Sequence, residues 1–331
     1  YAERFFYIDG DDPSTTLTEP NAEYEKEVPS IYGVATDVGL GKIDRVEVAI
    51  STNSQSYYWT GSSWTTNTHW LQAEATDGLF NSNNEPWNLS SNLPVFENNK
   101  TYEVQVRVYD KAGRVKYYPI PYLSFTIDIA SPTAAISTPI DGTKGLNSVT
   151  LTSGTASDNG RNQSVWIAIQ QLGSPPLWFD GSGFNVSQAQ PYWIEINGTN
   201  GYLSPDATTW IYSPSGMDNA FSGGLKYLIL TKARDVAGNE QDTFEVGISS
   251  KVVYVDKAPP VTSITLPADM GDGVSGRYQP QNIGKTATNS RFYGSCVDNY
   301  YSQNNAGCER TQIRLSYLLD GDTYYWTGVG F

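Results

Sequence analysis

The sequence is short of the residues that carry most enzyme chemistry. Its 331 residues include one histidine, two cysteines and two methionines. The histidine, His69, has no histidine or cysteine at ligand spacing, which argues against a histidine-dependent triad and a zinc site. No G-x-S-x-G elbow, phosphate-binding loop or dinucleotide fingerprint occurs. The acidic pair Asp11 and Asp12 precedes Pro13 in a linker, where no glycosidase cleft is expected. We therefore expect that the chain is not an enzyme.

Positive charge is scarce as well. There are 21 Lys and Arg residues against 35 Asp and Glu, which gives a formal net charge of −14 and a pI near 4.5. Such a surface repels nucleic acid and anionic membranes and suits cation binding. The chain has no run of 18 apolar residues, and its first residues lack the pattern of a signal peptide. We expect no nucleic-acid partner and no membrane insertion in this segment.

Amphipathic helix patterns are also missing, and what is present favours strands. The composition is 39% hydrophobic, 13% aromatic and 17% charged, with 23 tyrosines. That is enough apolar material for real cores, so wholesale disorder is not expected. Tyrosine and threonine favour strands over helices. The composition predicts an all-β protein.

Internal repeats organise the chain. A short apolar strand ending in Asp occurs three times, at residues 6–9, 125–128 and 253–256. In each copy a proline follows four residues after the Asp and another follows seven residues later. These prolines are Pro13 and Pro20, Pro132 and Pro139, and Pro260 and Pro267. Three triplets at one spacing indicate tandem units.

The body of each unit repeats too. The matching segments are 33–37 with 154–158 and 294–298, 57–61 with 177–181 and 324–328, and 102–113 with 227–238. Period-2 strands separated by polar turns predict tandem immunoglobulin-like antiparallel β-sandwiches. We assign residues 1–10 to the last strand of a preceding domain, 11–130 and 131–258 to complete domains, and 259–331 to the first half of a further, truncated domain.

The repeat signature resembles that of bacterial Ig-like repeats of large surface proteins and adhesins. The motifs are a Gly-Thr-Ala-x-Asp strand end at 154–158, an Ala-x-Asp-x-Ala-Gly-Asn turn at 233–239, and Val-Asp-x-x-Pro-Pro at 255–260. The first repeat departs from it, with Arg114 in place of Asn239 and Ser131 in place of the first proline of the pair. The resemblance implies an extracellular stalk, adhesin or surface layer.

Aspartates recur at one end of each predicted sandwich. Each set takes one aspartate from the incoming linker, one from the B–C loop and one from the F–G turn. The first set is Asp9, Asp37 and Asp110, the second is Asp128, Asp158 and Asp235, and the third contains Asp256 and Asp298. Carboxylates that converge from three segments are the hard oxygen ligands that Ca²⁺ needs, so interdomain calcium is one reading. The other is that each Asp makes an Asx-type turn bond to its own backbone. No other cofactor is indicated.

The two cysteines, Cys296 and Cys308, lie twelve positions apart in a polar stretch. No CxxC pair or neighbouring histidine suggests a metal. We predict a disulfide that closes the long B–C loop of the third repeat, which favours an oxidising compartment. Two free thiols in a reducing cell are the alternative.

Aromatic residues recur at matched positions. The tryptophans form the sets Trp59, Trp178 and Trp326, Trp70 and Trp193, and Trp87 and Trp210. Exposed aromatics can stack on sugars, but repetition at one structural position favours core packing. Tyr102 and Tyr227 begin the penultimate strand, where Ig-type sandwiches carry a tyrosine corner.

Tandem repetition, proline-containing linkers and the lack of a catalytic set favour a structural role. We expect a spacer in a long extracellular or cell-surface protein, with neighbouring repeats as partners and self-association into a filament or surface layer open. The alternative is an adhesin-type domain that binds a glycan or protein receptor directly through the segments where the repeats diverge, 70–100 and 183–215.

Overall fold

The computed structural model describes residues 3–4, 8–39, 41–140, 145–266, 292–298 and 306–327. Half of residues 1–10, where a last strand is predicted, lies outside these ranges, and the described residues 8–10 are not in a strand. Within the described ranges the regular secondary structure is almost entirely strand, and the helix is a single four-residue turn, α1 (Met217–Ala220). Among the described residues, no helix has the length and apolarity to cross a membrane.

The first sandwich has a four-stranded and a seven-stranded sheet. The four-stranded sheet runs in the order β1 (Ser14–Glu19), β3 (Ile31–Thr36), β9 (Asn84–Leu89) and β8 (Glu74–Ala75). The second sheet runs in the order β2 (Tyr24–Glu25), β11 (Val115–Ile127), β10 (Lys100–Asp110), β4 (Ile43–Thr52), β5 (Tyr57–Trp59) and β6 (Trp64–Thr65), with β7 (Leu71–Gln72) also paired to β4. This is the A-B-E-D and G-F-C strand order of an immunoglobulin-like sandwich.

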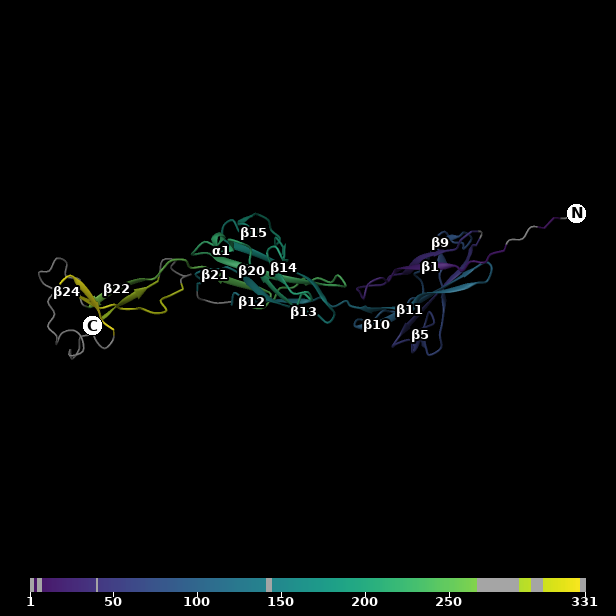
Figure 1. Cartoon of the computed structure of the whole chain (residues 1–331), viewed down its shortest axis with the longest axis horizontal. Coiled ribbons are helices and arrows are strands. Elements are labelled where there is room, and N and C mark those ends of the chain that lie inside the picture. The colour runs from purple at the N-terminus through teal and green to yellow at the C-terminus, as the bar shows by residue number, and fades with distance from the viewer. Residues whose placement is uncertain are drawn as a thin grey trace.

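The second sandwich repeats this order. Its four-stranded sheet contains β12 (Thr133–Thr138), β13 (Thr152–Ser157), β19 (Thr209–Tyr212) and β18 (Gly201–Leu203). The facing sheet contains β16 (Phe184–Val186), β15 (Leu177–Phe179), β14 (Asn162–Leu172), β20 (Lys226–Asp235) and β21 (Ser250–Tyr254), with β17 (Ile194–Glu195) paired to β14. Figure 1 shows the two sandwiches following one another along the long axis of the molecule. Beyond them lie two antiparallel strand pairs, β22 (Val261–Leu266) with β23 (Tyr293–Val297), and β24 (Ser316–Leu319) with β25 (Asp322–Tyr325).

Each core is built from period-2 side chains of the central strands. On β10, Tyr102, Val104, Val106 and Val108 are all fully buried. They pack with Val46, Val48 and Ile50 of the adjacent strand β4, and the intervening residues lie on the opposite face of the sheet. The same alternation on β14 and β20 gives the second sandwich its own separate cluster. In the described part of the chain each sandwich therefore has its own main core, and a short segment after β11 links the two sandwiches.

The repeated glycine of the second strand has a packing role. Gly33 lies opposite Trp87 in the register of β3 and β9, and Gly154 lies opposite Trp210 in the second sandwich. A Cβ at either glycine would collide with the backbone of the adjacent strand and with the indole ring. Both indoles are 1% exposed, so the glycine allows the large ring to lie flat in the core. This pairing explains why glycine and tryptophan recur together.

Both predicted tyrosine corners are present. The Tyr102 hydroxyl accepts a hydrogen bond from the Glu97 backbone N–H at 3.0 Å. The Tyr227 hydroxyl accepts one from the Ser222 N–H at 2.8 Å, at the same spacing of five residues. Each ring is fully buried, and each hydroxyl ties the penultimate strand to the segment that precedes it.

Candidate cation sites at the ends of the sandwiches

Three chain segments meet at the entry end of the first sandwich, and each carries one aspartate. Asp9 lies on the incoming segment, Asp37 follows β3, and Asp110 ends β10. Strand β4 follows β3 and runs antiparallel to β10, with Asp110 opposite Ile43, the first residue of β4. The end of β10 therefore lies at the same end of the sandwich as the end of β3. A carboxylate oxygen from each of the three lies within 4.8 Å of the other two.

The second sandwich has an equivalent triplet. Asp128 follows β11 on the linker, Asp158 follows β13, and Asp235 ends β20, again with one oxygen from each within 4.8 Å of the others. Two oxygens bound to one Ca²⁺ at the usual distance of about 2.3–2.6 Å lie at most about 5 Å apart. Each triplet is therefore compact enough for its oxygens to share one ion.

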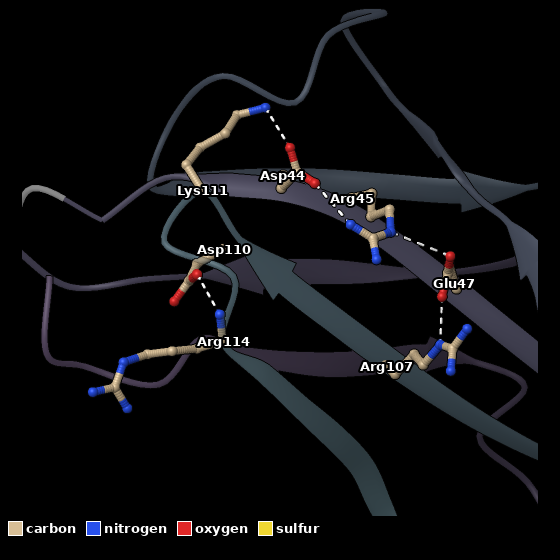
Figure 2. Close-up of polar contacts among 7 residues, drawn as sticks. All are labelled: Asp44, Arg45, Glu47, Arg107, Asp110, Lys111 and Arg114. Atoms are coloured by element: carbon tan, nitrogen blue, oxygen red, sulfur yellow. Dashed lines mark hydrogen bonds and ion pairs between the residues drawn. The ribbon is translucent and has the colours of Figure 1, made fainter.

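Hydrogen bonding leaves buried oxygens of the first triplet without partners. Asp37 Oδ1 accepts the Val38 N–H at 2.8 Å. Asp110 Oδ1 accepts the Arg114 N–H at 2.8 Å, as Figure 2 shows. The Oδ2 atoms of Asp37 and Asp110 are buried and have no hydrogen-bond partner. The two residues are only 6% and 2% exposed. A buried carboxylate oxygen without a partner is costly, so each of these Oδ2 atoms is available to accept a contact from a cation or a water molecule.

The second triplet is partly satisfied by amides. Asp128 is 1% exposed; its Oδ1 accepts the Ala130 N–H at 3.2 Å, and its Oδ2 is buried without a partner. Asp235 accepts two bonds from Asn239, one from the backbone N–H at 2.8 Å and one from Nδ2 at 2.9 Å. These bonds hold Asp235 in place and leave it lone pairs for a further contact. Asp128 is the member of this triplet with an unfilled buried oxygen.

One aspartate in each triplet has a raised pKa. Burial raises the pKa of the Asp37 carboxyl above its ordinary value, and the nearby charges of Asp9 and Asp110 add to this. Burial likewise raises the pKa of Asp128, with further contributions from Asp158 and Asp235. Burial and neighbouring negative charge both disfavour the ionised carboxylate, so the two causes act in the same direction.

The basic residues near the first triplet are paired elsewhere. Figure 2 shows the Arg114 side chain directed away from Asp110, and its guanidinium pairs with Asp12 at 2.8 Å. Lys111 pairs with Asp44 at 2.8 Å. Among the described residues, no lysine or arginine forms an ion pair with any of the six clustered aspartates. Three carboxylates at each site therefore remain uncompensated by protein cations.

A glycine lies against each triplet. A Cβ on Gly41 would overlap the Asp37 carboxylate, and a Cβ on Gly160 would overlap Asp128 Oδ2 and lie 3.2 Å from Asp158 Oδ2. Neither glycine has the positive φ that would require it for backbone reasons, and the space that each leaves is used by carboxylate oxygens. The absent side chain thus lets the carboxylates approach one another.

The second triplet lies at the joint between the two sandwiches. Glu23 of the first sandwich pairs with Arg161 of the second at 3.9 Å. A Cβ on Gly160 would lie 3.3 Å from the ring of Tyr24, which places this tyrosine against the β13–β14 loop. A bound cation at Asp128 would therefore act on the contact between domains.

The third predicted group differs. Asp256 is 2% exposed, but both its oxygens are used: Oδ1 accepts the Ala258 N–H at 3.0 Å and Oδ2 accepts the Ala306 N–H at 2.5 Å. Asp298 Oδ1 is buried without a partner, and both aspartates line a cavity of about 550 Å³ that also contains Glu309. Among the described residues, neither Asp256 nor Asp298 belongs to a compact group of three possible metal ligands like the two triplets.

The cysteines flank this third group. Cys296 and Cys308 are joined by a disulfide, with their Cα atoms 6.2 Å apart. Asp298 and Ala306 lie two residues inside the two ends of the loop that the disulfide closes. The bond therefore fixes the base of the loop that contacts Asp256.

Most repeated tryptophans are packed. Trp87, Trp210 and Trp178 are buried, Trp59 is half-buried, and Trp326 is 43% exposed. The matched pair Trp70 and Trp193 makes stacking contacts as well. The Arg107 guanidinium carbon lies 4.3 Å from the centroid of the Trp70 ring, and the Trp193 ring stacks on Phe244. In both sandwiches these rings contribute to the packing of the sheet, as the repetition predicts.

Sequence reasoning did not identify the two glycines or the two amides at these sites. Gly41 and Gly160 follow the loop aspartates within four residues, and Asn239 closes the F–G turn motif. Asn159 directly follows Asp158. A search for small or amide residues beside the repeated aspartates would have found all four.

Comparison with known proteins gives similarity to solved structures only. No family model matches the chain, and no curated protein matches it. It is similar to fibronectin(III)-like modules of CbhA from Clostridium thermocellum at 15% identity over 73% of this chain and 94% of that one, with a TM-score of 0.34. It is also similar to a 1.5-MDa bacterial ice-binding adhesin, from a study of its retention at the host cell surface, at 16% identity over 77% of this chain and 67% of that one, with a TM-score of 0.32. The assignment of an all-β, immunoglobulin-like architecture rests on the chain's own strand order.

Proposed function

We propose that this chain is a non-enzymatic structural segment of an extracellular or cell-surface repeat protein, related to bacterial Ig-like repeats, whose domain joints are stiffened by Ca²⁺. The observation that carries this proposal is the duplicated aspartate triplet at the entry end of each sandwich, with buried Oδ2 atoms that lack partners in Asp37, Asp110 and Asp128. A turn-forming role alone accounts for the Oδ1 atoms and leaves these Oδ2 atoms unexplained.

The donor set favours a hard divalent cation. Every candidate ligand atom is an oxygen, and the described residues place no histidine or cysteine in either group. Ca²⁺ accepts six to eight oxygens in flexible geometry, including carboxylates, amide carbonyls and water. The loops that supply these aspartates can adjust to that geometry more easily than to the strict octahedron of Mg²⁺.

The position of the second triplet suggests how binding would affect the array. Asp128 lies on the linker, while Asp158 and Asp235 belong to the second sandwich. Neutralising the three carboxylates would remove their mutual repulsion and fix the linker to the end of that domain. Repeated at every joint, this effect would turn a jointed chain into a stiff rod that spaces other parts of the protein from the cell.

Isothermal titration with CaCl₂ tests the proposal. Wild-type chain should bind calcium with dissociation constants of about 10⁻⁴ to 10⁻³ M, the range of extracellular modules. Asp37→Asn should remove the contribution of the first site, and Asp128→Asn that of the second. Asp242→Asn, an exposed acid outside both triplets, is the matched control and should titrate as the wild type. A chain that gives no calcium-dependent heat at millimolar concentration would contradict the proposal.

A further inference from the structure

Asn159 lies beside the second triplet, on the exposed loop between β13 and β14. One end of its side-chain amide is 3.3 Å from Asp128 Oδ1 and 3.2 Å from Asp158 Oδ1. With the amide nitrogen at that end, Asn159 donates to both carboxylates. With the amide oxygen there, three oxygens from three different residues face one another. The first orientation suits bare carboxylates, and the second suits carboxylates that share a cation.

Resting on the proposed calcium-bound function, we propose that Asn159 is a further oxygen ligand at the joint between the two sandwiches and that its amide turns over when the ion binds. Without a cation, the amide NH₂ group offsets part of the repulsion between Asp128 and Asp158. When a divalent cation enters, the same NH₂ group would point its hydrogens toward positive charge. Rotation by half a turn presents Oδ1 instead, an oxygen type that Ca²⁺ accepts readily.

The other amide at the site cannot make this change. Asn239 is 2% exposed, and its Nδ2 donates both to Asp235 Oδ2 at 2.9 Å and to the Asp128 carbonyl at 2.8 Å. Turning it would break both bonds inside the protein. Asn159 is exposed, and its terminal torsion is of the broad, nearly two-fold kind. The site therefore pairs one fixed amide with one that is free to turn.

The first triplet lacks this element. The residue that follows Asp37 is Val38, which is 57% exposed and offers no side-chain oxygen. The two sites thus have equivalent aspartates and differ in the residue that follows the loop aspartate, Val38 at the first site and Asn159 at the second. The effect of this residue on calcium binding can therefore be compared within one chain.

The test uses the chain carrying Asp37→Asn, so that calcium titration reports on the second site. Adding Asn159→Leu, which is close in shape and has neither donor nor acceptor, should weaken calcium binding about tenfold, the lower end of the effect of losing a supporting metal-site group. Adding Asn159→Asp, which offers oxygens only, should tighten it about tenfold because ligand charge increases affinity. Val38→Leu in the same background should leave the affinity unchanged.

The sign of the Asn159→Leu effect separates the proposal from a purely structural role. If Asn159 only donates to the carboxylates, its removal frees them for the ion, so binding would become tighter or stay the same, and the inference would be overturned. NMR spectra of the Asn159 side-chain NH₂ group give a second readout. Its resonances should shift on calcium saturation in a way that indicates loss of the bonds to the carboxylates. Unchanged resonances would count against rotation.

Calcium binding by the chain and the role of Asn159 can be tested separately. Wild-type chain that binds no calcium would overturn both the proposed function and the role of Asn159. Wild-type chain that binds calcium, combined with an Asn159→Leu variant that binds at least as tightly, would overturn the role of Asn159 alone.

Discussion

Asn239 and Asp128 lie 111 positions apart in the sequence, and the Asn239 Nδ2 group donates to the backbone carbonyl of Asp128 at 2.8 Å. The Asp128 N–H in turn donates to the carbonyl of Glu25 in the first sandwich at 3.0 Å. The backbone of one residue is therefore bonded to both domains, and its side chain belongs to the aspartate triplet. A charge bound at this carboxylate acts where the two domains are joined.

The glycines beside the triplets should be needed for cation binding. Gly41→Ala and Gly160→Ala each place a methyl group where carboxylate oxygens lie, so each should weaken calcium binding at its own site, by about tenfold. Gly198→Ala is the matched control because a Cβ there meets no atom within 4 Å. Calorimetric titration measures the three variants. Equal affinities in all three would show that the carboxylates do not need to approach so closely.

Stability should depend on pH in chelator. Asp37 and Asp128 have folded-state pKa values raised by burial and by neighbouring carboxylates. The folded state therefore binds more protons than the unfolded state between the ordinary and the raised pKa, and its stability falls as pH rises through that window. With EDTA present, the melting temperature of the two sandwiches should rise as pH is lowered from 7 toward the ordinary Asp pKa. Saturating calcium should flatten this part of the profile. A chelated protein that loses stability over the same descent would contradict the assigned repulsion.

The tyrosine corners should stabilise both sandwiches. Tyr102→Phe removes the acceptor for the Glu97 N–H, and Tyr227→Phe removes that for the Ser222 N–H. Each should lower the free energy of unfolding by about 1 kcal/mol, the usual value of one hydrogen bond. Tyr202→Phe, at a half-exposed ring, serves as the control. Urea denaturation followed by tryptophan fluorescence gives the values, and midpoints indistinguishable from the control would remove the corner from the account.

The repeat spacing was sufficient to predict the sandwich architecture and the packing of the aromatic residues. Apolar side chains occupy every second position at Tyr102, Val104, Val106 and Val108, which predicts that one face of this strand is buried. Tryptophan recurs at matched positions, Trp87 and Trp210, which predicts the same core position in both sandwiches. These features depend on which side of a strand a residue occupies, and a period of two determines this from the sequence.

The finer structure of the sites could not be predicted in the same way. Asp37 and Asp158 occupy equivalent strand ends, yet Asp37 Oδ1 accepts the N–H of the next residue, whereas Asp158 Oδ2 accepts that of Gly160 two residues on. Loop length and local hydrogen bonds set these orientations, and the repeat carries no record of them. Loop conformation also places the Asn159 amide beside Asp128 and Asp158. It likewise brings the Ala306 N–H to Asp256 Oδ2.

The most direct test of the central claim is the distance between the two sandwiches with and without calcium. Spin labels at the exposed positions Gln72 and Gln190, one on each sandwich, allow pulsed electron resonance to report the distance distribution. The account predicts one narrow distribution in calcium and a broader one in EDTA. Asp128→Asn should be broad in both conditions, and Asp242→Asn should behave as the wild type. Distributions of equal width with and without calcium in the wild-type chain would contradict a cation-stiffened joint.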